Sequence, residues 1–318
     1  MNKKIQVEIL LTNDLHLTEI DIELKVECTF NKNRKQLKSV QKTFPCDSLI
    51  RIDYVIGEYM KLWDDYQQPL YKLTASIRND SVYDSKSVSF GMREFGVHDK
   101  QFSINNRTTF LRGKHDACVF PLTGHPPMDK EGWLKVFKIA QSYGINHYRF
   151  HSYCPPKAAF EAADQVGIFL QPELPFWGGL DTDSVAARLR DEGLSMLKHY
   201  SNHPSFVMFG AGNEIWAGHD RFDNVIKELK EKDKRPLYTT GANNNIGYVW
   251  PSEYSDFHIA ARIPYENDTT LTHLRLTHAF VDSRDGGILN TQTPSATHNF
   301  NYAVDKINLP LISHEIGQ

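Results

Sequence analysis

The chain has 318 residues and a net charge of −3, with 36 basic and 39 acidic side chains and 40% hydrophobic residues. Mixed charge without a basic excess argues against a nucleic-acid partner. No apolar run approaches the ~20 residues that a membrane-spanning helix needs, so we expect no membrane partner. The length suits two domains with a sizeable core.

The four cysteines are scattered without CxxC spacing, at Cys28, Cys46, Cys118 and Cys154. Such spacing indicates neither a zinc site nor a disulfide framework. The amino-terminal residues 1–5 lead into strand-like alternation and lack the apolar core of a signal peptide. We therefore expect no metal and no cofactor, and the chain alone does not indicate a cellular compartment.

Residues 1–97 predict an immunoglobulin-like β-sandwich. In residues 20–30 every second side chain is apolar and the others are mostly charged, as in a half-buried antiparallel strand. Further short strands are expected at 5–11, 49–55, 70–77 and 82–90. Several short strands without helices, separated by polar stretches such as 31–36, favour a sandwich.

From residue 98 the pattern changes to strands that alternate with helices. A hairpin is expected over 102–113, with Asn105–Asn106 as its turn. Helical spacing of apolar residues occurs around 133–140 and 222–229, and Asp183–Ser184 can cap a longer helix. Short buried strands are expected at 145–150, 168–170, 206–209, 237–240 and 257–260. This alternation predicts a (β/α)8 TIM barrel over residues 98–318.

The barrel strands number seven when counted from Phe110–Leu111 to Leu311–Ser313. A closed barrel of this type needs an eighth strand. We therefore expect a TIM barrel that is truncated after its seventh strand and incomplete at the carboxyl terminus. Residues 265–309 show the least regular pattern and are expected to form a long loop region over the site.

Two glutamates follow predicted strands about a hundred residues apart. The apolar run Phe206–Phe209 leads through a glycine-rich step to Glu214, and Leu311–Ile312 leads to Glu315. Barrel enzymes place catalytic groups at the carboxyl ends of their strands. Paired carboxylates there are what glycoside hydrolysis requires, although a single strand-end glutamate can equally be a solvated acid.

An ordered set of short motifs extends over nearly the whole chain. After the sandwich come Phe-Gly-Met-Arg-Glu-Phe at 90–95, Phe-Ser-Ile-Asn-Asn at 102–106 and Phe-Leu-Arg-Gly at 110–113. Later motifs lie at 144–155, 164–168, 212–214 and 313–317. The set resembles glycoside hydrolase family 2, the family of β-galactosidases, β-glucuronidases and β-mannosidases.

The resemblance implies a retaining exo-β-glycosidase, β-galactosidase-like, that acts on a carbohydrate substrate. Glu214 would be the general acid and base, and Glu315 the nucleophile, with their carboxyl groups ~5–5.5 Å apart. Asn213 would bind the sugar 2-hydroxyl, with a structural amide cap as the alternative. Arg149 would orient Glu315 and keep it ionised through a charge-assisted hydrogen bond.

Further side chains at predicted strand ends are candidates for the substrate-binding pocket. The histidines either line the pocket or make hydrogen bonds in the core, and the tryptophans either stack on sugar or pack against loops. These candidates are His115, His151, His258, Trp177 and Trp216. Glu173 is a third strand-end acid with a structural or sugar-hydroxyl role.

The sequence departs from the family pattern in two places. We expect this chain to lack the jelly-roll domain with which family members usually begin, and His314-Glu315-Ile316 replaces the commoner Glu-Tyr-Gly, which leaves the subfamily and the sugar open. The metal ligands of β-galactosidases do not carry over. The resemblance is also compatible with a homo-oligomer of the full-length protein in the periplasm or outside the cell.

Two other functions stay open from the residues alone. One is a metal-dependent barrel hydrolase, in which His115, His151, His258 and His314 gather at the barrel mouth. No HxH or HxxxH spacing joins two of these four histidines. The other is a non-catalytic carbohydrate-binding fragment, because seven strands leave an open edge.

Overall fold

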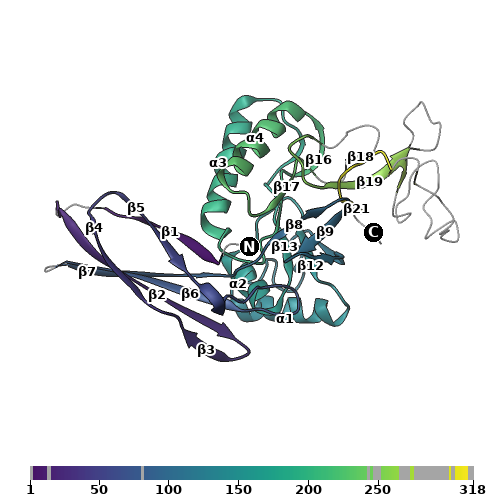
Figure 1. The fold of residues 1–318 in the computed structure, drawn as a ribbon. Coiled ribbons are helices and arrows are strands. Elements are labelled where there is room, and N and C mark those ends of the chain that lie inside the picture. Colours follow the sequence, from purple (N-terminus) through teal and green to yellow (C-terminus); the bar gives the residue numbers. More distant parts are fainter. Residues whose placement is uncertain are drawn as a thin grey trace. The chain divides into compact units, whose positions relative to one another are not determined.

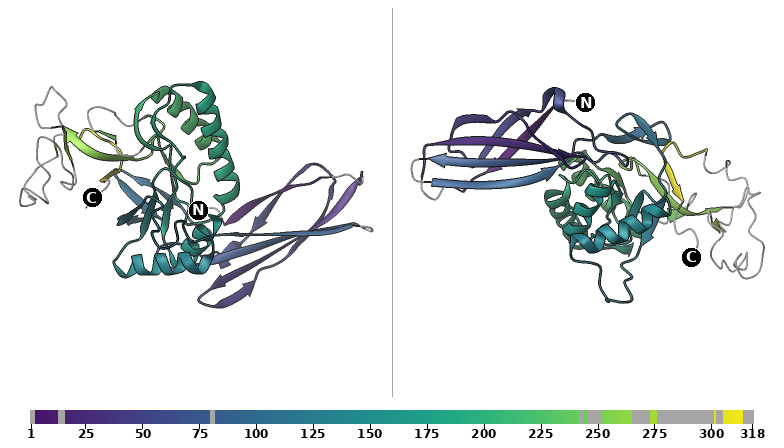
Figure 2. Two further views of the ribbon diagram at one scale, coloured as in Figure 1. Left: turned by 180° about the vertical axis from the view of Figure 1, so that it is seen from behind. Right: turned by 90° about the horizontal axis from the view of Figure 1, so that it is seen from below.

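The computed structural model describes residues 3–12, 16–79, 82–241, 244–245, 252–264, 273–275, 301 and 305–313. The chain divides into two compact units, Met1–Glu94 with Asn202–Pro204, and the remainder. Each unit is described by itself (Figures 1 and 2). The division falls after Glu94 rather than after Val97, because strand β8 (Phe95–His98) pairs with β9 (Gln101–Ile104) in the second unit.

The first unit is a sandwich of two antiparallel sheets. One sheet pairs β1 with β5; the other has β2 in its centre, with β6 and then β7 on one side and β3 and β4 on the other. The strands are β1 (Lys4–Leu10), β2 (Glu19–Phe30), β3 (Asn33–Gln36), β4 (Val40–Pro45), β5 (Leu49–Val55), β6 (Leu70–Asn79) and β7 (Val82–Phe90). A single 3₁₀ turn is described here, Gly57–Tyr59.

The predicted alternation in β2 builds the core of the sandwich. The apolar side chains at alternate positions of β2 are buried, and they pack with inward residues of β5 such as Ile52 and Tyr54. The interpretation of residues 31–36 as a polar spacer was wrong, because β3 lies within it. All four side chains of β3 are exposed, so no alternation marks this strand in the sequence.

Seven barrel strands are described in the second unit. Parallel pairing joins β11 to β12, β12 to β13, β15 to β17 and β19 to β21. Isolated parallel bridges pair Leu170 with Phe206 and Glu173 with Gly210, and so join the β13 and β15 segments. The strands are β11 (Gly113–Asp116), β12 (His147–Phe150), β13 (Phe169–Gln171), β15 (Met208–Gly210), β17 (Leu237–Thr239), β19 (His258–Pro264) and β21 (Leu311–Ser313). The prediction of a first strand at Phe110–Leu111 was wrong, since Phe110 is 77% exposed and the strand begins at Gly113.

Four helices with described bounds pack around these strands, α1 beside α2 and α3 beside α4 (Figure 1). Their bounds are α1 (Lys130–Ser142), α2 (Lys157–Val166), α3 (Asp183–Tyr200) and α4 (His219–Lys232). The N-cap of α3 is Thr182, one residue before the predicted Asp183–Ser184, and its side chain accepts from the Val185 amide. Within the described ranges, no helix has the length and apolar character to cross a membrane.

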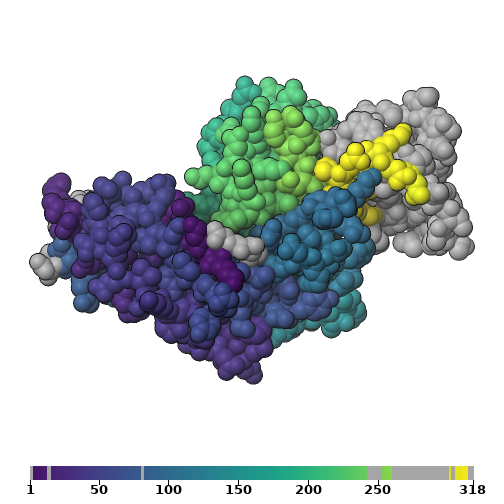
Figure 3. All heavy atoms as spheres, viewed as in Figure 1, coloured from purple at the N-terminus to yellow at the C-terminus, as the bar shows by residue number. Residues whose placement is uncertain are grey.

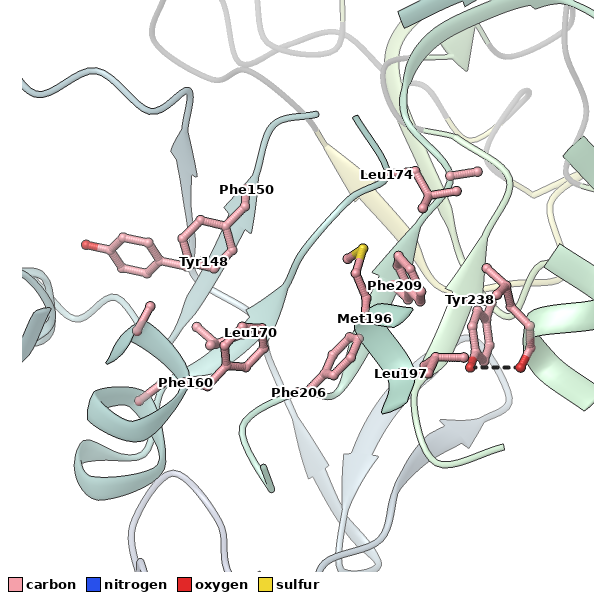
Figure 4. Close-up of a cluster of buried hydrophobic side chains, with 14 of the residues drawn as sticks. Tyr148, Phe150, Phe160, Leu170, Leu174, Met196, Leu197, Phe206, Phe209 and Tyr238 are labelled. Carbon is pink, nitrogen blue, oxygen red and sulfur yellow. Dashed lines mark hydrogen bonds between the residues drawn. The ribbon is translucent and has the colours of Figure 1, made fainter. Parts of the chain in front are cut away.

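The side chains that point outward from the strands form the core between strands and helices. Figure 4 shows Tyr148 and Phe150 of β12 beside the aromatic and aliphatic residues of this cluster. The ring of Tyr148 lies 4.9 Å from that of Phe137 on α1. Since successive strand residues face opposite sides, His147 and Arg149 point into the barrel interior.

A small antiparallel sheet of β8, β9 and β10 (Arg107–Thr109) precedes the barrel. The predicted hairpin turn is confirmed: Asn105 and Asn106 have φ values of 51° and 64°, as a type I′ turn requires. Asparagine tolerates this left-handed conformation better than most residues do.

This hairpin sheet lies at the amino ends of the barrel strands. The ring of Phe95 lies 5.3 Å from Phe169, where β13 begins, and Phe102 lies 5.9 Å from Phe257, just before β19. Residues 305–313 are yellow in Figure 3 and lie beside blue atoms of an earlier segment. Lys100, which follows β8, donates to the Asp305 carbonyl at 3.2 Å. The carboxyl ends of the strands are therefore on the other side of the barrel.

Candidate active site

A buried ion pair joins the carboxyl ends of β12 and β13. Arg149 Nε donates to Glu173 Oε1 at 2.6 Å and Nη2 donates to Oε2 at 2.9 Å, with side chains only 6% and 0% exposed. The Ser152 amide also donates to Oε2, at 2.9 Å. Both carboxylate oxygens are thus engaged, which gives Glu173 a structural role rather than one in binding a sugar hydroxyl.

Asn213, at the start of β16 (Asn213–Ala217), completes this network. Its Oδ1 accepts from Arg149 Nη2 at 2.7 Å, and the residue is fully buried. Two buried donors, Arg149 Nη1 and Asn213 Nδ2, have no hydrogen-bond partner among the described residues. Because orphaned buried donors are costly, these two mark a place where a ligand or a further side chain is expected to bind.

Glu214 follows in an unusual backbone conformation. It has φ of 46°, in the left-handed region that costs a non-glycine residue about 1–2 kcal/mol. Gly212, two residues earlier, has φ of 144°, and a Cβ there would lie 2.6 Å from the Phe176 carbonyl oxygen. Strain of this kind is commonly retained at functional sites.

A two-stranded parallel ribbon carries Glu214 beyond the end of the barrel strand. β14 (Trp177–Gly179) pairs with β16, with Trp177 opposite Asn213. Trp177 Nε1 donates to Glu214 Oε2 at 2.9 Å, and the side chain of Trp177 remains 56% exposed. Trp216 is 64% exposed and its ring packs on Gly178, where a Cβ would lie 2.9 Å from it.

Two histidines continue the row of rings that starts at Trp177. The rings of Trp177 and His151 are 5.1 Å apart, and those of His151 and His115 are 5.0 Å apart. Burial, and next the Arg149 guanidinium, lower the pKa of His115 to about 4 and lower the pKa of His151. Both imidazoles are therefore neutral near pH 7.

His258 lies on β19 and is 2% exposed. Its Nε2 has no hydrogen-bond partner among the described residues, and burial lowers its pKa to about 4. His147, which shares a face of β12 with Arg149, is equally buried, and its pKa is also lowered to about 4, mainly by burial. The interior thus holds neutral imidazoles around one buried ion pair.

The structure brings together most of the residues predicted from the sequence. Direct contacts join Arg149 to Asn213, Glu214 to Trp177, and the rings of His115 and His151. Glu315 lies outside the described residues, so its separation from Glu214 and its predicted contact with Arg149 stay predictions. The observed carboxylate partner of Arg149 is Glu173.

The metal hypothesis has no support in the described part of the chain, where no three His, Cys, Asp or Glu side chains are placed to hold an ion. His314 lies outside the described residues.

Three contributors to the site were missed in the sequence. Ser152 supplies its amide to Glu173, while His147 and Gln171 are buried polar residues of the interior. His147 stands two residues before Arg149, so the alternation of β12 contained the signal for one of them.

These features define a class: a sandwich followed by a TIM barrel that carries an acid, an amide and a buried arginine at the carboxyl ends of its strands, as barrel enzymes do. The model of the family "Glycosyl hydrolases family 2, TIM barrel domain" matches residues 95–278, more than half of the chain. The model "Glycosyl hydrolases family 2" matches residues 2–93. The chain belongs to glycosyl hydrolase family 2.

Curated relatives agree with this assignment, and a solved structure agrees with the fold. A beta-galactosidase of Thermoanaerobacterium thermosulfurigenes is 26% identical over 61% of this chain and 27% of that protein. A beta-glucuronidase of Streptococcus agalactiae is 25% identical over 55% of this chain and 33% of that protein. A family 2 structure from Bacteroides cellulosilyticus has a TM-score of 0.67 at 16% identity, covering 98% of this chain and 41% of that chain. The chain spans a third or less of the length of the curated relatives named here.

The strain at Glu214 predicts that replacement by glycine destabilises the protein less than replacement by alanine. Glu214→Gly and Glu214→Ala both remove the carboxylate and its bond to Trp177, but only alanine keeps the Cβ that opposes positive φ. We expect the glycine variant to have the higher free energy of unfolding, by about 1 kcal/mol. Urea unfolding measures the difference. A more stable alanine variant would show that this backbone is not strained.

Burial of His258 predicts a loss of stability in acid. Its pKa is about 4 in the folded state against ~6.5 unfolded, so between these two pH values the unfolded chain binds a proton that the native chain does not. The cost should be on the order of 2 kcal/mol at pH 5. In urea unfolding at pH 7.5 and pH 5, His258→Gln should lose less stability than wild type. His98→Gln, at an exposed position, should match wild type; equal pH dependence in all three proteins would contradict the argument.

Proposed function

We propose that the protein is a retaining exo-β-glycosidase that hydrolyses O-glycosidic bonds of carbohydrates, with Glu214 as acid and base and Glu315 as nucleophile. The observation that carries the proposal is the arrangement at the end of the fourth barrel strand. There a buried amide held by Arg149 stands next to a strained, partly exposed glutamate in a family 2 barrel.

The reaction would proceed in two displacements. In the first, Glu214 gives its proton to the glycosidic oxygen while Glu315 attacks the anomeric carbon, so that the aglycone leaves as an alcohol and a glycosyl ester forms on Glu315. In the second, Glu214 takes a proton from water as the water oxygen attacks the same carbon and the ester bond breaks. Two inversions give net retention.

The buried network would stabilise the transition state. Asn213 Nδ2 is a buried donor in need of a partner, and a sugar 2-hydroxyl is a suitable acceptor. Arg149 Nη1 is a second such donor and would hold the Glu315 carboxylate. Both are fixed in advance by the bonds of Arg149 to Glu173 and Asn213, so they need no reorganisation during the reaction.

The sugar ring would bind against the row of neutral rings. His115 and His151 can hydrogen-bond sugar hydroxyls without carrying charge, and the exposed face of Trp177 can contact the C–H face of a pyranose. The names of relatives include both beta-galactosidase and beta-glucuronidase. A β-galactoside is our first candidate substrate, and a β-glucuronide is the comparison that tests it.

The proposal predicts hydrolysis of nitrophenyl β-glycosides by this chain or by a longer polypeptide that contains it. In a panel of β-galactoside, β-glucuronide, β-mannoside and α-arabinoside, at least one should be cleaved, and proton NMR should first show the anomer that has the configuration of the substrate. Glu214→Gln and Glu315→Gln should each lower kcat by about 100-fold or more, because each removes a reacting group.

Controls separate the other functions. Glu161→Gln, on the exposed face of α2, should leave the rate unchanged. Loss of activity on chelation would indicate a metal-dependent hydrolase, and sugar binding without turnover would indicate a carbohydrate-binding module. Formation of the inverted anomer first would contradict the two-glutamate mechanism.

A further inference from the structure

The bond from Trp177 to Glu214 is built into the backbone around both residues. The register of the β14–β16 ribbon sets Trp177 opposite Asn213, the residue before Glu214. The Asn213 amide donates to the Phe176 carbonyl at 3.0 Å, so the residues before Trp177 and Glu214 are also joined. The indole then reaches Glu214 Oε2 with its only polar atom, at 2.9 Å.

The indole is held on its other side as well. The His151 ring contacts the Trp177 ring nearly edge to face, at 5.1 Å and 64°. Glu214 itself has a left-handed backbone conformation, and its carboxylate accepts from this indole. Each of the two residues is thus held in place by its own surroundings, unlike a pair of mobile surface side chains.

We propose that Trp177 is a positioning residue that determines which oxygen of Glu214 transfers the proton. This inference rests on the proposed function of Glu214. An indole N–H can donate but cannot accept, and a carbonyl oxygen is a better acceptor than a hydroxyl oxygen, so the oxygen that faces the indole is the unprotonated one. The proton of the neutral acid is therefore on Oε1, and Oε1 delivers it to the glycosidic oxygen and later accepts one from water.

The same bond favours the transition state over the ground state. As Glu214 loses its proton, Oε2 gains negative charge, and a hydrogen bond to an ionised acceptor is stronger than one to a neutral acceptor. An interaction that strengthens as charge develops raises kcat and not only binding. A role limited to stacking on the sugar would not depend on how much proton transfer the leaving group needs.

The experiment compares two substrates of the preferred sugar that differ only in leaving group. A 2,4-dinitrophenyl glycoside departs with little help from an acid, whereas a methyl glycoside requires full protonation. Trp177→Phe keeps a ring but removes the N–H. It should lower kcat/KM for the methyl glycoside about 10-fold or more, and should change kcat/KM for the dinitrophenyl glycoside less than about 3-fold. The matched control Trp216→Phe should change kcat/KM for both substrates by the same factor.

Two outcomes would overturn the proposal: an equal loss on both substrates with Trp177→Phe, which indicates a sugar platform, or no loss on either. A measurement that needs no activity tests the bond itself. Urea midpoints of Trp177→Phe, Glu214→Ala and the double variant should be non-additive, with the double variant losing less than the sum of the single losses. If no glycoside is hydrolysed at all, the proposed function fails, and additive midpoints would then reject the contact as well.

Discussion

The buried pair of Arg149 and Glu173 is the constraint on which the site depends. Two charges removed from water are stable only when geometry and additional hydrogen bonds compensate them. Here the pairing is bidentate, and the Ser152 amide and Asn213 satisfy further groups. Because the members come from the ends of three strand segments, the pair fixes the relative position of the chain around Glu214.

The strain at Glu214 becomes understandable within this frame. A left-handed glutamate would relax if its neighbours allowed it, but Asn213 is held by Arg149 and by the Phe176 carbonyl. Gly212 makes the approach to that carbonyl sterically allowed. Stability elsewhere in the barrel, above all the apolar layer between strands and helices, maintains a conformation that is locally unfavourable and places the carboxylate beside Trp177.

The sequence predicted the elements whose buried residues form a recognisable apolar pattern. Alternation located β2, the apolar run 206–209 located β15, and Asn105–Asn106 marked a turn that needs positive φ. It missed β3, which is exposed throughout, and it placed the first barrel strand too early because Gly113–Asp116 contains polar residues. For such strands, pairing with neighbours and not composition determines the conformation.

The sequence predicted which residues belong to the site better than it predicted which of them are in contact. Strand-end positions identified Glu214, Asn213 and Arg149, because parallel strands bring their carboxyl ends to one face. The pairing of Arg149 with Glu173 depends on strand register and side-chain direction, which one sequence does not specify. The bond from Trp177 to Glu214 likewise needs the β14–β16 ribbon, whose strands are too short to show a periodic pattern.

The most direct test of the account is a crystal structure of the protein after reaction with a 2-deoxy-2-fluoro glycoside, which accumulates the glycosyl ester. The account predicts sugar bonded to Glu315, with the Glu214 carboxyl group ~5–5.5 Å from that of Glu315 and on the opposite side of the anomeric carbon. An ester on another residue, or carboxyl groups separated by the ~6.5–9.5 Å of an inverting enzyme, would contradict it.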